Sequence, residues 1–385
     1  MNLKQKRLQR CHYKDDTMSI GTEHEYSINN RSFKPLPVSD LILERISGRI
    51  QNETPLGEII VSKELQKHVL EIVPRRPGRS LAELERVLHA GIQNLYSCLT
   101  PEFQLLGLGM HPLLTLDMTT VWDHDEREIY EVYDRLFNIH QHGWLNIQAL
   151  QINIPYASEE ELVTLYNKIR SIIPYVVAIT TASPFVEGKS TGTMDNRLIY
   201  YRKNQERIPS ICHGLIPEPL QTLADYHAIH DDMCRSLMER GGEALCREWV
   251  NSRGVIVRFS RCCLEIKAID EQECIHADMA VTAFVLSLLR CRDLPLEKDQ
   301  DALLALTEEA IAKGTEAFRQ ELEKLYDLAL QHATEDQRRY LPHIKRRIEK
   351  GSLAELLSTR YKSKGSITPL LRDLEYCLRE NIPYI

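Results

Sequence analysis

The sequence predicts an α+β fold built around a mainly antiparallel sheet. Stretches with strand-like alternation and stretches with helical spacing are interspersed along the 385 residues, without the regular strand–helix–strand order of a doubly wound parallel sheet. The chain contains neither Gly-x-Gly-x-x-Gly nor a complete Gly-x-x-x-x-Gly-Lys-Ser/Thr loop, so both common nucleotide-binding loops are absent. Several predicted strands combine an apolar face with a polar one, which is typical of antiparallel sheets.

Five stretches with period-two alternation predict the strands of this sheet. The first contains the sequence MSIGTEHEYSI, the fourth contains ALQINIPY, and Pro74 ends the second. The last carries Cys262 and Cys263, whose side chains would point to opposite faces of a strand. The predicted strands cover residues 18–28, 67–73, 103–110, 149–156 and 256–269.

Apolar residues at helical spacing predict the helices between these strands. Ser80 precedes Leu81 and is followed three residues later by Glu83, which is the capping-box pattern, and Ser158-x-x-Glu161 repeats it. Residues 188–202 are rich in Gly, Ser and Thr and are predicted to form a loop of functional length. The predicted helices lie within 34–48, after 80, over 125–138, after 158, and almost throughout the chain from residue 276.

The composition excludes several classes of protein. Hydrophobic residues make up 43% and charged residues 27% of the chain, which argues against a disordered or fibrous protein. The 48 Lys and Arg against 55 Asp and Glu give a net charge of −7, so we expect no nucleic-acid partner and no membrane partner. With no apolar run of the length needed for a secretory signal or a membrane span, the expected location is the cytoplasm.

Four of the predicted strands carry acids or amides on one face, because residues i and i+2 of a strand share a face. A solvated face would explain any one of these strands. As a set, however, Glu, Gln and Asn are poor strand formers, and converging carboxylates repel one another unless a cation neutralises them. Mg²⁺ and Mn²⁺ prefer such oxygen ligands, so the pattern indicates a divalent-metal site. The positions are Glu23, Glu25, Glu71, Gln151, Asn153, Glu265 and Lys267.

A second candidate feature is the segment TTASPFVEGKSTGTMDNR, residues 180–197. It brings small residues together with two cations, Lys189 and Arg197. Close backbone approach and fixed positive charge are what a phosphate group needs, although an ordinary surface loop would have a similar composition.

Five motifs in order resemble the glutamate–cysteine ligase family, in both its plant-type branch and the bacterial carboxylate–amine ligases of glutamate–cysteine ligase type 2. They occur between about residue 18 and about residue 290. The motifs are Gly21-Thr22-Glu23-His24-Glu25, Gly109-Met110-His111-Pro112, Gln151-Ile152-Asn153, Ala182-Ser183-Pro184-Phe185-x-Glu187-Gly188-Lys189 with Arg197, and Leu264-Glu265-Ile266-Lys267-Ala268-Ile269-Asp270.

The resemblance implies a glutamine-synthetase-like fold, in which a curved, mainly antiparallel sheet forms a half-open funnel with helices on its outer face. It implies residues 1–295 as the glutamine-synthetase-like catalytic region. Residues 296–385 match no motif of the family, and their helical pattern predicts a C-terminal extension packed on the same domain. The implied activity is ATP- and Mg²⁺-dependent (or Mn²⁺-dependent) joining of an amino-acid carboxylate to an amine through an acyl phosphate, with a γ-glutamyl product as the leading member. The partners would be these small molecules, with a homo-oligomer left open.

The resemblance also implies roles for the residues of the polar face. Gln151 and Asn153 would contact metal-bound water, nucleotide or substrate. Arg197, assisted by Lys189, would hold the γ-phosphate or the acyl phosphate. Lys267 stands where the family usually has Arg, which replaces a bidentate fork with a point charge. The implied metal ligands are Glu23, Glu25, Glu71 and Glu265.

Two other function classes remain open at this point. One is a guanidino-type phosphotransferase on the same fold, which would release ADP and a phosphorylated product without an amide. The other is a non-catalytic relative that binds a nucleotide or amino acid and acts through a protein partner. The retained Glu23, Glu25 and Glu265 favour an enzyme over the second class.

Overall fold

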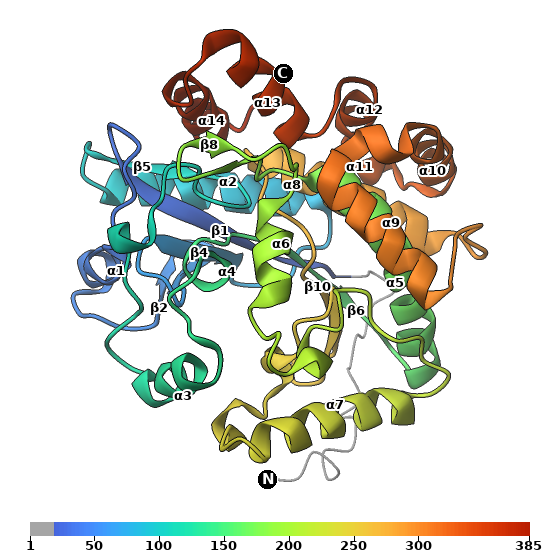
Figure 1. The fold of residues 1–385 in the computed structure, drawn as a ribbon. Helices are drawn as coiled ribbons and strands as arrows, with labels where there is room; N and C mark the ends of the chain where they lie inside the picture. Colours follow the sequence, from blue (N-terminus) through green and yellow to red (C-terminus); the bar gives the residue numbers. More distant parts are fainter. Residues whose placement is uncertain (1–18) are drawn as a thin grey trace.

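The computed structural model describes residues 19–385 and shows a mixed α/β protein with an open antiparallel sheet (Figure 1). Its strands are β1 (Gly21–Asn30), β2 (Glu53–Leu56), β3 (Ile59–Lys63), β4 (Val69–Pro74), β5 (Phe103–Leu106), β6 (Leu150–Pro155), β9 (Val255–Arg258) and β10 (Cys263–Ile266). Their order is β2-β3-β4-β1-β6-β10-β9, with β5 paired to β1 beside this path. The antiparallel sheet is therefore confirmed, whereas its curvature into a half-open funnel stays a prediction.

The observed sheet differs from the predicted one at two hairpins. The predicted strand over residues 256–269 is wrong in extent, because the chain reverses between β9 and β10, where Cys262 has a φ of 52°. The hairpin of β2 and β3 was not predicted. Its turn contains Gly57 with a φ of +62°, and Pro55 is tolerated because β2 is an edge strand.

Three helices cover the apolar face of the sheet: α2 (Leu81–Cys98), α5 (Glu159–Thr180) and α8 (Ile275–Arg290). Helix α2 packs on β3 and β4, α5 packs on β9 and β10, and α8 contacts both helices. The predicted N-caps are confirmed, since Ser80 accepts from the Glu83 amide and Ser158 accepts from the Glu161 amide. By length and composition α5 could cross a membrane, but 72% of its apolar window is buried inside the protein, as in a core helix.

Shorter helices and the C-terminal helices surround this core. A separate hairpin is formed by β7 (Phe185–Val186) and β8 (Lys189–Ser190). The helices are α1 (Ser39–Ser47), α3 (Arg127–Phe137), α4 (His142–Leu145), α6 (Asn196–Lys203), α7 (Leu223–Met238), α9 (Gln300–Lys313), α10 (Arg319–His332), α11 (Glu335–Arg338), α12 (Leu341–Lys350), α13 (Leu353–Lys364) and α14 (Thr368–Glu380).

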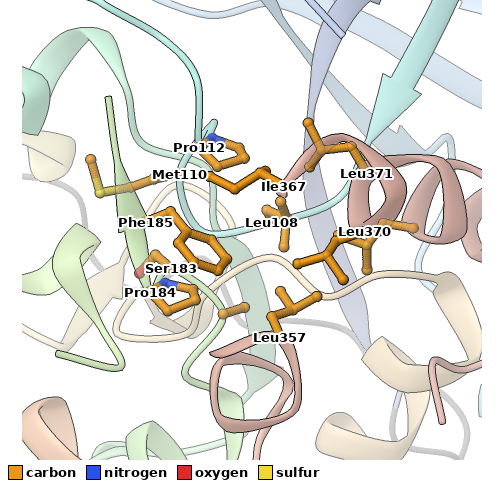
Figure 2. Close-up of a pocket in the computed structure, with 12 residues that line it drawn as sticks. Leu108, Met110, Pro112, Ser183, Pro184, Phe185, Leu357, Ile367, Leu370 and Leu371 are labelled. Atoms are coloured by element: carbon orange, nitrogen blue, oxygen red, sulfur yellow. The ribbon is translucent and has the colours of Figure 1, made fainter. Parts of the chain in front are cut away.

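The C-terminal helices pack on two parts of the fold. Helix α9 contacts α5, α10 and α12 contact α8, and α14 contacts β5. Figure 2 shows Leu370 of α14 and Leu357 of α13 beside Phe185 and Pro112, around an apolar cavity of only about 10 Å³. Parts of two of the sequence motifs therefore serve as packing surfaces for the C-terminus. The division of the chain at residue 295 stays a prediction.

One polar cluster is buried beneath the sheet, between β1 and α8. The His24 Nδ1 atom lies 3.1 Å from Asp278 Oδ2, and its Nε2 lies 2.9 Å from Thr22 Oγ1. Glu271 accepts a hydrogen bond of 2.9 Å from the Glu25 amide. His24, Glu271 and Asp278 have no solvent exposure. This cluster ties the central strand to the helix behind it.

We expect His24→Ala to destabilise the protein by about 3–5 kcal/mol, because removing one partner leaves buried carboxylates uncompensated. The measurement is the free energy of unfolding from urea denaturation without ligands. The matched control is His332→Ala, which removes an exposed histidine at the end of α10 and should change stability by less than about 0.5 kcal/mol. Equal effects of the two substitutions would contradict the anchoring role of His24.

Candidate active site

The predicted polar face exists and is shared by four strands. In the antiparallel register, Glu25 stands opposite Glu71 and Glu23 stands opposite Gln151. Asn153 stands opposite Glu265. Directly opposed residues of an antiparallel pair project to the same side, so strand alternation correctly placed all of these side chains together.

One group of carboxylates on this face is Glu25, Glu64 and Glu71. Each offers an oxygen atom within 4.8 Å of the others. Glu64 follows β3 directly, two residues after Ser62, which stands opposite Glu71 in the register. Burial is the main cause that raises the pKa of Glu25 to about 8, and the negative charge of Glu64 is the second. Burial and the nearby charge of Glu23 raise the pKa of Glu71 well above its usual range. The group carries more negative charge than its surroundings compensate, so it fits a bound cation.

A second group lies further along the same face, around Glu23 and Glu265. Asn153 Nδ2 donates to Glu23 Oε1 over 2.8 Å. Arg261 forms an ion pair with Glu23, and Arg258 forms one with Glu265. Burial opposes ionisation of Glu23, but Arg261 outweighs it with the help of neighbouring hydrogen bonds and lowers the Glu23 pKa. This end of the face therefore combines two carboxylates with two arginines that neutralise them.

Lys267 belongs to the same end of the face. Its Nζ atom lies 3.7 Å from Glu265 Oε1. Burial lowers its pKa, but the nearby Tyr201 and Glu265 raise it by more, so the pKa of Lys267 stands above its ordinary value. The lysine is therefore charged at neutral pH and supplies a point charge to the site.

Arg197 lies on a helix rather than in the predicted loop. The prediction of a loop over residues 188–202 is wrong in its second half, because the Asp195 side chain accepts from the Leu198 amide over 2.8 Å and starts α6. Arg197 is only 1% exposed. Its Nε donates to Asp270 Oδ1 over 2.6 Å, and its Nη2 donates to the Lys267 carbonyl over 3.2 Å. The guanidinium group is thereby held in a fixed orientation.

Asp270 is the residue that holds Arg197, and two sequence motifs in turn hold Asp270. The Ala182 amide and the Ser183 hydroxyl both donate to Asp270 Oδ2 over 2.8 Å. Gly109 approaches the Asp270 carboxyl so closely that an added Cβ would lie 2.2 Å from it. A glycine is therefore needed at position 109 for this close approach. The motifs around residues 109 and 183 contact Asp270, which in turn orients Arg197.

A cavity of about 190 Å³ opens beside this arrangement. Its walls contain Glu25, Glu64, Gln151, Arg197 and Lys267 together with uncharged and aromatic side chains. The structure does not bring Lys189 to this cavity: Lys189 is exposed on β8 and is not part of the lining. The assisting role of Lys189 stays a prediction.

Sequence reasoning missed three residues of this region, Glu64, Arg258 and Arg261. It also missed the role of Asp270. Alternation would place Glu64 on the same face as Ser62, two residues before it, but strand β3 itself was not predicted. Arg258 ends β9 and Arg261 lies in the turn that leads to β10, a turn that a single long strand would not contain. Their positions depend on that hairpin.

The family that the chain matches places it in the class of carboxylate–amine ligases. The chain belongs to glutamate–cysteine ligase family 2 (GCS2), which matches residues 19–373. The match continues through the C-terminal helices, beyond the last recognisable motif near residue 290. An uncharacterized protein of Archaeoglobus fulgidus is 49% identical over 370 residues, covering 95% of this chain and 100% of that protein.

More distant relatives agree with this assignment. A putative glutamate–cysteine ligase 2-2 of Rubrobacter xylanophilus is 27% identical over 169 residues, covering 43% of this chain and 38% of that protein. The crystal structure of glutamate–cysteine ligase from Francisella tularensis in complex with AMP has a TM-score of 0.66 at 10% identity, covering 96% of this chain and 89% of that one. A bifunctional glutathione synthetase from Pasteurella multocida has a TM-score of 0.64 at 13% identity, covering 95% of this chain. This chain spans 52% of that synthetase, and at these identities both structures show the fold alone.

Proposed function

We propose that this protein is an ATP- and Mg²⁺-dependent ligase that forms an amide, with glutamate's γ-carboxylate as the leading donor, through an acyl phosphate. The observation that carries the proposal is the cluster of Glu25, Glu64 and Glu71, whose oxygens lie within 4.8 Å of one another beside a buried arginine. A carboxylate is a poor acyl donor until it is phosphorylated, and phosphoryl transfer requires alignment and charge neutralisation. The site offers both.

The residues present fit divalent cations. Glu25, Glu64 and Glu71 would hold one ion, and Glu23 and Glu265 would hold a second, with carboxylate oxygens that suit Mg²⁺ or Mn²⁺. When bound, such cations would neutralise the negative charge of the phosphate groups during phosphoryl transfer. Gln151 Nε2 donates to Glu25 Oε1 over 3.1 Å and so orients this carboxylate.

The cationic side chains have separate tasks in the proposed reaction. Arg197 would neutralise the phosphoryl group in transfer and the acyl phosphate, because its orientation is fixed by Asp270 before substrate binds. Arg258, Arg261 and Lys267 would face the triphosphate at the Glu23–Glu265 end. The AMP bound to the related Francisella ligase supports a nucleotide on this fold.

The proposed reaction has two steps. A substrate carboxylate oxygen bonds to the γ-phosphorus of ATP while the bond from that phosphorus to the β–γ bridging oxygen breaks, which releases ADP. The amine nitrogen then bonds to the acyl carbon while the bond from carbon to the phosphate oxygen breaks. Inorganic phosphate leaves, and the proton of the amine passes to a base.

The test is a panel of amino-acid carboxylates incubated with the full-length protein, ATP, Mg²⁺ and hydroxylamine. We expect ADP release with formation of a hydroxamate, which is the product of hydroxylamine and an acyl phosphate, and with glutamate as the best donor. A hydroxamate from another carboxylate only would overturn the donor and keep the ligase. ADP with a stable phosphorylated product would select the phosphotransferase, and nucleotide binding without turnover would select the non-catalytic relative.

A further inference from the structure

The connection between helices α12 and α13 contacts two segments that lie outside the cavity lining but lead to Arg197. We call residues 347–354 the α12–α13 turn, since they join the end of α12 to the start of α13. The two segments are residues 180–183, at the end of α5, and residues 270–273, before α8. They meet at the Asp270 carboxyl group, which accepts from the first segment and holds Arg197.

The first contact of the α12–α13 turn is with Thr181. The Thr181 hydroxyl donates to Ser352 Oγ over 2.7 Å, and the Ala354 amide donates to the Thr181 carbonyl over 3.0 Å. Thr181 and Ser352 have no solvent exposure. The two groups that donate to Asp270 Oδ2 belong to the next two residues along the chain. The turn therefore holds the backbone directly before both of these donors.

The second contact is with Glu273, three residues after Asp270. Arg347 Nη2 donates to Glu273 Oε1 over 2.5 Å, and the Tyr384 amide donates to the same oxygen over 2.9 Å. Arg347 is 2% exposed and Glu273 has no exposure. Hydrogen bonds are directional, so this buried pair fixes the orientation of the second segment more closely than apolar packing would.

Gln272 joins the two segments to each other. Its Nε2 atom donates to the Thr180 carbonyl over 2.9 Å and to the Asp270 carbonyl over 2.7 Å. On its other side the backbone of Gly107 lies so close that an added Cβ would stand 2.2 Å from the Gln272 carbonyl oxygen. Little free space surrounds this junction, so a displacement of one segment is passed to the other.

We infer that the α12–α13 turn positions Arg197 through Asp270. None of residues 347–354 lines the cavity, so Thr181 and Arg347 are positioning residues that touch no substrate. The inference rests on the proposed ligase function, in which Arg197 neutralises the phosphoryl group in transfer. A misplacement of about 1 Å that originates far from the chemistry can cost about a hundredfold in rate, so loss of either contact slows phosphoryl transfer.

The first experiment compares Thr181→Val with Thr181→Ser in the hydroxamate assay. Valine keeps the shape of threonine and removes only the hydroxyl, while Ser352 Oγ still accepts from the Glu355 amide and caps α13. We expect Thr181→Val to lower kcat at least about tenfold with KM for ATP within about twofold, and Thr181→Ser to recover most of the loss. The matched control is Thr359→Val, which removes an exposed hydroxyl on α13 and should leave kcat within about twofold.

A double-mutant cycle with Asp270→Asn separates positioning from general destabilisation. Once Asp270 no longer orients Arg197, adding Thr181→Val should lower kcat by less than about twofold more. The same factor in both backgrounds would mean a structural role only and would overturn the inference, as would a kcat of Thr181→Val equal to that of the wild type. Absence of hydroxamate from the wild-type protein with every carboxylate would overturn the proposed function, and the inference with it.

Arg347→Lys tests the second contact independently. Lysine keeps the charge but lacks the fork, so it cannot contact Glu273 and also donate to His343 Nε2, which lies 3.3 Å from Arg347 Nε. We expect kcat to fall at least about tenfold, again with less than a twofold further effect in the Asp270→Asn background. The control is Arg346→Lys, at the exposed neighbouring position on α12, which should leave kcat within about twofold. Equal effects of the two lysine substitutions would contradict the role of the turn.

Discussion

Glu25→Gln is expected to lower the rate of amide formation by at least about a hundredfold to a thousandfold. The substitution keeps the shape of the side chain but removes the carboxylate that would bind a cation together with Glu64 and Glu71. Glu25 Oε2 also accepts from the Ala149 amide over 2.9 Å, so the glutamine would face this donor with one oxygen fewer. The measurement is kcat for ADP release with saturating ATP, Mg²⁺ and the best donor and amine.

The matched control for this prediction is Glu44→Gln, which removes an exposed carboxylate on α1 and should leave kcat within about twofold. The unfolding temperature of both variants checks that the fold is kept. Retention of more than a tenth of the wild-type rate by Glu25→Gln would contradict the assignment of this carboxylate to the catalytic machinery.

Arg197→Lys is expected to lower kcat by at least about a thousandfold, the lower end of the effect of an arginine that stabilises a transferring phosphoryl group. Lysine keeps the positive charge but has no fork, so it cannot pair with Asp270 and reach into the cavity at the same time. The readout is kcat in the hydroxamate assay, which removes any effect of the amine. KM for ATP should change less than kcat, because the guanidinium acts mainly on the charge that develops during transfer.

Arg202→Lys on the same helix is the control for Arg197→Lys. Arg202 is paired with Glu308 on α9 and is not part of the cavity lining, so its substitution should leave kcat within about twofold. Asp270→Asn gives an independent check of the positioning of Arg197. It should lower kcat less than Arg197→Lys does, and a larger loss in Asp270→Asn would mean that Asp270 itself contacts the reacting groups.

Much of the polar face could be predicted because strand alternation is a local property of the sequence. Glu23 and Glu25 share a face by their spacing alone, and the register then adds Glu71 from β4. Glu64 was missed because β2 and β3 are short, meet at Gly57, and carry Pro55 at an edge. Glu64 could therefore be assigned to the acidic group only with knowledge of the β2–β3 hairpin, which the alternation did not predict.

The errors around Arg197 and residues 256–269 have a different physical cause. The small residues before Asp195 are typical of a loop, yet one side-chain cap at Asp195 was enough to start α6. Between β9 and β10 the alternating pattern continues across a turn, so nothing in the period marks the reversal. The partnership of Arg197 with Asp270 joins residues 73 positions apart, and such long-range contacts are not encoded in local spacing.

The two faces of the central strand β1 carry side chains with different roles. Glu23 and Glu25 point to the polar face, where Glu25 lines the cavity, while His24 points the other way, into a cluster with no solvent exposure. A shift of one residue along β1 would exchange these sets, which would bury two acids in the core and present a histidine to the substrates. Strand β1 is therefore unsuited to insertions and deletions. Attempts to change the substrate range by engineering belong on side chains such as Tyr201, which line the cavity from outside the sheet and can be exchanged without moving the register.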